Sequence, residues 1–156
     1  MKLEPPRFED GKQLIIAGLR GRFTSATWAG IPAQWERLIS HGTLHDQVGK
    51  AHYGLCFNVS GGFDYLSGVE VRDTANLPAG YTHVTVPAQR YVVFSHLGHV
   101  SKIRDTCDAI WRQWFPRSGY EFAKPAAGAP DFFERYGELF NPETGMSDIE
   151  VWIPIR

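Results

Sequence analysis

One order of predicted elements occurs twice along this chain, and that repetition restricts the fold more than any other feature. In each half an apolar strand precedes an amphipathic helix, and two more strands follow the helix. The two helices come into register when Trp35 is aligned with Trp111, about half of the chain apart. An order of β-α-β-β in both halves predicts an α+β fold with an internal pseudo-two-fold axis. We expect a single domain over residues 1–156, with halves at about 12–75 and 80–156.

Two short sequence echoes accompany this repeat. Leu14–Gly18 falls on Arg90–Phe94 in the helix alignment, and Tyr53-Gly54-x-x-Phe57-Asn58 resembles Tyr136-Gly137-x-x-Phe140-Asn141 at a slightly different spacing. Two modules packed side by side leave a seam between their helices, and such seams are common ligand sites. The repeat therefore predicts where a pocket would lie.

Periodicity and breaker residues set the expected elements. A helix is predicted to begin near Pro32 and to end at Gly42, with an apolar face of Ile31, Trp35, Leu38 and Ile39. A second helix over Ser101–Phe115 carries Ile103, Cys107, Ile110 and Trp114 at helical spacing. Residues up to Gly11 are expected to form an extended lead-in. The predicted strands are Leu14–Thr24, His52–Val59, Phe63–Arg72, Tyr81–Val86, Tyr91–Leu97, Phe132–Phe140 and Asp148–Ile155.

Charge and hydropathy narrow the class of partner. Sixteen basic residues against seventeen acidic ones produce no positive field, and no basic run occurs, so we expect no direct nucleic-acid binding. The N-terminal residues form no signal-type apolar region, and no apolar run is long enough to span a membrane, which favours a cytoplasmic location. The two cysteines, Cys56 and Cys107, are expected to be buried, reduced thiols.

The sequence lacks the common catalytic and cofactor motifs. It has no nucleophile elbow, no phosphate-binding loop, no dinucleotide fingerprint and no zincin motif. His96 and His99 lie three apart, near His83, but no cysteine or carboxylate is spaced to complete a metal site, and His99 is a candidate helix cap. We therefore predict no metal and no cofactor.

Aromatic residues make up 13% of the chain, and two carboxylates, Glu70 and Glu134, lie among them. Strand alternation places Glu134 on one face with Phe132 and Tyr136. Two interpretations remain open from the pattern alone. The carboxylate either points outward or pairs with an arginine, or it lies at the floor of a pocket, where it attracts a cation or acts as a general base.

Several stretches of the sequence resemble the GyrI-like, or DNA-gyrase-inhibitor-like, effector-binding domains. The resemblance extends from about Leu14 to Ile155 and depends on the order of several stretches. These stretches are Ala29-Gly30-Ile31-Pro32-Ala33-Gln34-Trp35, Tyr53-Gly54-Leu55-Cys56, Gly68-Val69-Glu70-Val71, Arg104-Asp105-Thr106-Cys107-Asp108-Ala109-Ile110-Trp111, Phe133-Glu134-Arg135-Tyr136 and Glu150-Val151-Trp152-Ile153-Pro154-Ile155.

The resemblance implies one curved antiparallel sheet with two helices and a groove between the modules. It also implies a lipophilic, often cationic ligand, and it matches Glu134 to the acidic groove residue of the family. Our candidate ligand-binding residues are Glu134, Tyr136, Trp111, Trp28, Tyr53 and Glu70, whereas Trp35 and Trp114 are assigned to the core. Residues 1–13 are too few for a helix-turn-helix module, so we expect a stand-alone binding protein.

Two alternatives use other chemistry. In the first, Glu134 activates water in a hydrolase of strained electrophilic genotoxins. In the second, the chain inhibits or protects a protein partner such as DNA gyrase. We favour binding over catalysis.

Overall fold

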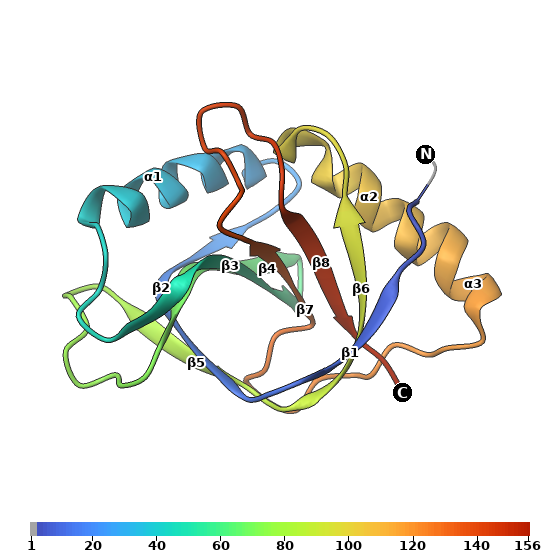
Figure 1. The fold of residues 1–156 in the computed structure, drawn as a ribbon, viewed down its shortest axis with the longest axis horizontal. Helices are drawn as coiled ribbons and strands as arrows, with labels where there is room; N and C mark the ends of the chain where they lie inside the picture. The colour runs from blue at the N-terminus through green and yellow to red at the C-terminus, as the bar shows by residue number, and fades with distance from the viewer. Residues whose placement is uncertain (1–2) are drawn as a thin grey trace.

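An eight-stranded antiparallel sheet with strong curvature supports the other elements in the computed structural model, which describes residues 3–156 (Figure 1). The strand order is β1-β6-β8-β7-β3-β4-β2-β5. The strands are β1 (Arg7–Gly11), β2 (Leu14–Phe23), β3 (Gln47–Val59), β4 (Gly62–Val71), β5 (Thr82–Val86), β6 (Gln89–His96), β7 (Phe132–Tyr136) and β8 (Ile149–Pro154).

Two helical segments cover one face of the sheet, one from each half of the chain (Figure 1). The first consists of η1 (Trp28–Gly30) and α1 (Ile31–His41), and Gly42 ends it with a φ of 86°. Pro32 lies in the first turn of α1, as its missing N–H allows. The second runs without a break through η2 (Val100–Lys102), α2 (Ile103–Ala109), a π-helical turn η3 (Ile110–Trp114) and α3 (Phe115–Ser118).

The sheet has the symmetry that the repeat predicts. Read from either end, the strand order is the same once β1 is exchanged with β5, β2 with β6, β3 with β7 and β4 with β8. The pseudo-two-fold axis passes between the central strands β3 and β7, which pair with each other. The prediction of a duplicated α+β fold with one curved antiparallel sheet and two helices is therefore confirmed.

The two sequence echoes do not coincide with this symmetry. Ile16 packs in the core on the sheet face opposite the helices, which we call the inner face. Its echo partner Val92 packs in the core under α2. Tyr53 and Tyr136 are separated in the same way, because Tyr53 lies opposite Arg135 in the β3–β7 ladder. Successive side chains of a strand point to opposite faces. A sequence match that is one residue out of phase therefore aligns side chains that lie on opposite faces of the sheet. The duplication resides in topology and not in these echoes.

Two element predictions need correction. The segment before Gly11 is not a lead-in, because Arg7–Gly11 forms β1 and pairs with β6. Strand β7 ends at Tyr136 and not at Phe140, because the chain then enters a loop and Phe140 packs against the helix-side core. The edge strand β1 leads directly into β2, and β5 leads directly into β6, so the two edges of the curved sheet are joined by continuous chain (Figure 1).

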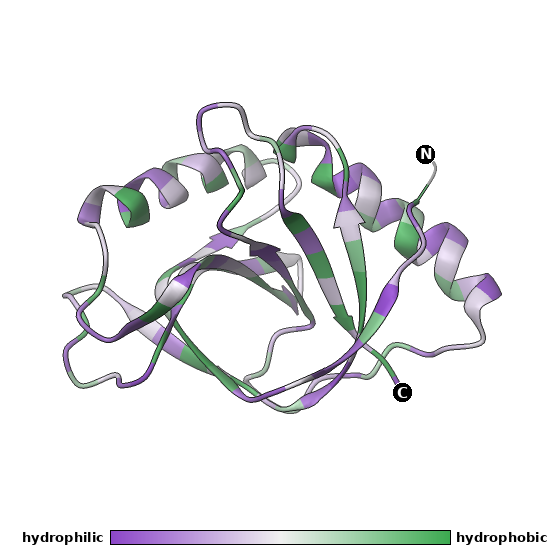
Figure 2. Ribbon diagram, in the orientation of Figure 1, coloured by the Kyte–Doolittle hydropathy of each residue, from purple (hydrophilic) through white to green (hydrophobic). Residues whose placement is uncertain are grey.

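Both faces of the sheet bury apolar side chains. The inner face encloses a core that includes Leu55, Leu66 and Phe133, and the helix-covered face buries Phe94, Ile110 and Val151. Figure 2 shows the matching pattern on α2, which alternates between hydrophilic and hydrophobic residues along its length. Among residues 3–156, no helix combines the length and the apolar character needed to cross a bilayer.

Candidate functional site

A carboxylate is buried at the centre of the helix-covered face. Glu134 on β7 exposes only 7% of its surface. Its Oε1 atom accepts hydrogen bonds from the hydroxyls of Tyr65, at 2.6 Å, and Tyr136, at 2.7 Å. The strand alternation that placed Glu134 and Tyr136 on one face therefore agrees with the structure, and Tyr65 arrives from β4, two strands away in the sheet.

No cationic side chain within residues 3–156 forms an ion pair with Glu134. Burial raises the pKa of Glu134 above its ordinary value, and the hydrogen bonds from Tyr65 and Tyr136 oppose that rise. When a buried carboxylate ionises without a paired cation, no opposite charge offsets its desolvation cost. Within residues 3–156, the hydrogen bonds that stabilise the ionised Glu134 carboxylate come from the two tyrosine hydroxyls.

Aromatic rings surround this carboxylate. The indole N–H of Trp35 on α1 donates to the Tyr65 hydroxyl at 3.2 Å, and the Trp35 ring lies edge-on to Tyr136 at a centroid distance of 5.5 Å. Phe140 also packs against Tyr136, at a centroid distance of 5.0 Å. Trp35, Tyr65, Glu134 and Tyr136 form what we call the acid cluster, which joins α1, β4 and β7.

A glycine on β3 leaves room for the acid cluster. Gly54 lies directly opposite Glu134 in the β3–β7 ladder. A Cβ atom at this position would collide with the Tyr65 hydroxyl and would lie 2.8 Å from Glu134 Oε1. Only a residue without a side chain therefore lets Tyr65 reach across β3 to the carboxylate.

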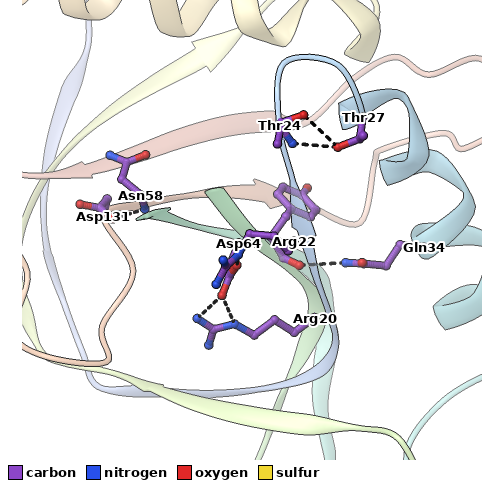
Figure 3. A network of polar contacts seen from close by, with 9 residues as sticks. Arg20, Arg22, Thr24, Thr27, Gln34, Asn58, Asp64 and Asp131 are labelled. Carbon is purple, nitrogen blue, oxygen red and sulfur yellow. Dashed lines mark hydrogen bonds and ion pairs between the residues drawn. The ribbon is translucent and has the colours of Figure 1, made fainter. Parts of the chain in front are cut away.

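A buried glutamine fixes α1 over the cluster. Gln34 exposes 2% of its surface, and its Nε2 lies 3.0 Å from the Leu19 carbonyl, the Tyr65 carbonyl and the Ser67 hydroxyl. Figure 3 shows the Gln34 side chain extending from α1 toward the sheet. Because Trp35 is the next residue, these contacts hold its indole beside Tyr65. The expected apolar face of α1 is thus wrong at Ile39, which is 50% exposed, while Gln34 is buried.

Both cysteines lie on this side of the sheet as free thiols, Cys56 buried and Cys107 half-buried. Burial raises the pKa of both thiols, and the nearby charge of Glu134 raises both further. Protonated thiols are weak nucleophiles, so covalent catalysis by either cysteine is not supported. Within residues 3–156, no group of three or more histidine, cysteine or acidic side chains is arranged to hold a metal ion.

The predicted site residues do not all converge. Tyr136 belongs to the acid cluster. Trp111 lies on the same face but packs on Phe115 and Phe122, with centroid distances of 4.9 and 5.1 Å. Trp28 lies in η1, where the Arg104 guanidinium of α2 is 4.7 Å from its ring centroid, so it connects the beginnings of the two helical segments.

Tyr53 and Glu70 lie on the opposite, inner face of the sheet. Tyr53 packs against Phe133 in the inner core, and the Glu70 carboxylate lies 4.0 Å from Lys12 Nζ. Both are candidates from the sequence because one is an aromatic and the other an acidic residue of a predicted strand. Their positions along the strands direct the side chains to the face opposite Glu134. The structure does not bring them to the acid cluster.

Two members of the cluster were missed by the sequence reasoning. The helix stripe assigns Trp35 to the core, and Tyr65 is not among the candidate residues. A tyrosine in a strand has no local signal for a partner 69 residues away. For Trp35, the signal was its place in the stretch Ile31-Pro32-Ala33-Gln34-Trp35, which carries the family resemblance.

Other polar groups in the molecule have structural roles. His96 is hydrogen-bonded to Thr106 at 2.7 Å and to the His99 carbonyl at 2.8 Å, and His99 Nδ1 accepts from the Ser101 backbone N–H as a helix cap. On the inner face, Arg20 and Arg22 of β2 both pair with Asp64 of β4 (Figure 3). A depression formed by α2 and η3 does not include any residue of the acid cluster. Its lining residues are Asp105, Asp108, Ala109, Arg112 and Gln113.

Comparison with known proteins agrees with this architecture. A family model described as the GyrI-like small molecule binding domain matches residues 4–156. The transcriptional regulator BrlR of Pseudomonas aeruginosa is 34% identical over 139 residues, which are 85% of this chain and 49% of BrlR. The chain thus spans about half the length of this curated relative.

Two solved structures share the fold at low sequence identity. SAV2435 bound to tetraphenylphosphonium aligns with a TM-score of 0.76 and 20% identity, over 98% of this chain and 94% of that one. EcmrR, in a complex with DNA, aligns with a TM-score of 0.69 and 16% identity, over 97% of this chain and 57% of EcmrR. The match of the family model over residues 4–156 shows that the chain belongs to the GyrI-like family of small-molecule-binding domains.

Proposed function

We propose that this chain binds a lipophilic cation against the Glu134 carboxylate, on the helix-covered face between α1 and α2. One observation carries the proposal: Glu134 is buried, and no cation from residues 3–156 pairs with it. A ligand cation would supply the missing charge, and the rings of Trp35, Tyr65 and Tyr136 present faces that attract cations. The tetraphenylphosphonium bound to SAV2435 is a cation of this class.

The proposed partner is therefore a small molecule and not a nucleic acid or a membrane. EcmrR forms its DNA complex as a longer protein than this chain. The free thiols of Cys56 and Cys107 suit a reducing compartment, and we propose the cytoplasm.

Two ions of the same shape and opposite charge test this function. Tetraphenylphosphonium and tetraphenylborate differ in charge but little in size, so their affinities isolate electrostatics from burial of phenyl rings. We expect the phosphonium to bind and, at a hundred times its Kd, to stabilise the fold by about 2.7 kcal/mol, measured as a rise in Tm. Calorimetric titration should detect little or no binding of the borate.

Two variants test which carboxylate attracts the ligand cation. Glu134→Gln should weaken phosphonium binding at least tenfold, because it removes the buried carboxylate and keeps its shape. Glu70→Gln makes the same change on the inner face and should leave binding unaltered. If the two variants weaken binding equally, or if the borate binds as well as the phosphonium, the proposed site is wrong.

A hydrolytic role for the same carboxylate is the second candidate. The raised pKa of Glu134 and the two adjacent tyrosine hydroxyls are features of a general acid or base. Incubation with a strained electrophile distinguishes the two functions. Product in excess of one equivalent, lost in Glu134→Gln, would establish turnover, whereas recovery of unchanged compound would favour binding alone.

A further inference from the structure

The two oxygens of the Glu134 carboxylate have different surroundings. Both tyrosine hydroxyls donate to the same atom, Oε1, from β4 and β7. Oε1 also faces β3, where the absent side chain of Gly54 leaves the space that it occupies. No hydrogen bond reaches Oε2 from residues 3–156.

Oε2 is also not completely sealed from solvent. In the described part of the chain, one side-chain polar atom is both sealed from solvent and without a hydrogen-bond partner. It is the Tyr81 hydroxyl. Oε2 also lacks a hydrogen-bond partner among residues 3–156, but it is not sealed from solvent in this way. It therefore keeps a small exposed surface. The residue as a whole is 7% exposed, and Oε2 is the carboxylate oxygen to which neither tyrosine hydroxyl donates.

The donors of the acid cluster are already used. Tyr65 and Tyr136 each have one hydroxyl proton, and each directs it to Oε1. The indole N–H of Trp35 is directed to the Tyr65 hydroxyl. Rotation of any one of these groups toward Oε2 would break a hydrogen bond of the cluster, so a ligand N–H would not compete with these donors for Oε2.

On the basis of the proposed function, we infer that the preferred ligand is a lipophilic protonated amine whose N–H donates to Glu134 Oε2. A charge-assisted N–H···O hydrogen bond is short and about twice as strong as a neutral one. A fully alkylated cation supplies the charge but no proton, and its alkyl groups hold the charge farther from Oε2. The acid cluster therefore distinguishes cations by the presence of an N–H donor.

Three matched naphthalene compounds test this inference on the unmodified protein. They are N,N-dimethyl-1-naphthylmethylamine, its trimethylammonium analogue and the neutral analogue with carbon in place of nitrogen. Affinities are measured by calorimetry at pH 7, where the amine is protonated. We expect the protonated amine to bind about tenfold or more tightly than the trimethylammonium compound, as expected of one hydrogen bond to a charged group. The trimethylammonium compound should in turn bind more tightly than the neutral analogue.

The possible outcomes separate this inference from the function on which it rests. Equal affinity of the two cations, both above the neutral analogue, would overturn the inference and leave cation binding intact. Equal affinity of all three compounds, or binding by none at millimolar concentration, would overturn both. In Glu134→Gln the advantage of the protonated amine should shrink to less than threefold, and an undiminished advantage would show that the N–H meets another group.

Discussion

At the scale of single residues, the molecule is organised around one buried charge. Most buried carboxylates in proteins pair with a cation, because ionisation in a low-dielectric site is otherwise costly. Glu134 has two neutral hydrogen bonds in place of an ion pair. These contacts reduce the cost without removing it, as the raised pKa of Glu134 indicates. A bound cation would remove the remainder, which couples ligand affinity to the protonation of one residue.

The affinity for a permanent cation should therefore depend on pH. Tetraphenylphosphonium does not titrate, and the proposed site would attract it only when Glu134 is ionised. Affinity should therefore rise with pH from about 4.5 through the raised pKa and then level off. The tyrosines and cysteines of the site have pKa values raised above their ordinary ranges and stay neutral there. Calorimetry across pH 4–8 measures the profile.

Glu134→Gln should flatten this profile, apart from a residual contribution from His52, whose pKa is lowered by burial. The unliganded protein should show the opposite trend. A raised pKa in the folded state means that the protonated group stabilises the fold below the unfolded pKa, and this contribution is lost as pH rises through the folded pKa. A wild-type affinity that stays constant between pH 4 and 8 would contradict the assignment.

At the scale of elements, one polar side chain attaches α1 to the sheet at the site. Of the helix residues, Gln34 and Leu38 are buried, and Gln34 reaches two backbone carbonyls and the Ser67 hydroxyl. A buried amide with these partners specifies one position for the helix, whereas an apolar face tolerates sliding. The position of Trp35 over Tyr65 follows from this attachment.

Substitution of Gln34 should loosen both the helix and the site. We expect Gln34→Leu, which keeps the volume and removes the hydrogen bonds, to lower stability by about 2 kcal/mol. We also expect weaker tetraphenylphosphonium binding, because Trp35 loses its fixed position. Ile39→Ala on the same helix is the control, since Ile39 is 50% exposed and should matter little. Thermal unfolding and titration of both variants measure the effects, and equal losses of stability would contradict this role for Gln34.

At the scale of the whole molecule, the sheet is stabilised where its two ends meet. The continuous segment of β1 and β2 runs antiparallel to that of β5 and β6, with β1 on β6 and β2 on β5. Strand β1 also places Arg7 2.6 Å from Glu150 and Phe8 against Tyr120, at 5.0 Å. The short strand β1 thereby covers the edge of β6 that would otherwise be open to another chain.

Removal of β1 should affect both stability and association. Deletion of residues 1–11 is expected to lower the Tm and to cause concentration-dependent oligomers, because the backbone groups of β6 become an unpaired edge. Deletion of residues 1–5 removes Leu3 but leaves β1 intact, so the difference between the two deletions isolates the strand. Differential scanning calorimetry and size-exclusion chromatography with light scattering would check this. Two deletions with the same Tm and the same mass would show that β1 is dispensable.

Local sequence determined the elements and part of the site. Pro32 and Gly42 placed the ends of α1, and the repeat of strands around two helices predicted the symmetric sheet. The alternation in β7 was sufficient to put Glu134 and Tyr136 on one face. These features depend on neighbours within a few residues, where backbone geometry leaves few choices.

Only the tertiary structure decided which residues meet at Glu134. Alternation shows which residues of one strand share a face, but not which face the helices cover, and here both faces bury apolar side chains. Tyr53 and Glu70 were therefore grouped with the site although they lie on the inner face, whereas Tyr65 and Trp35 were left out. Their positions depend on strand register and helix attachment across many residues of chain, because a shift of one residue in either would turn the side chains away.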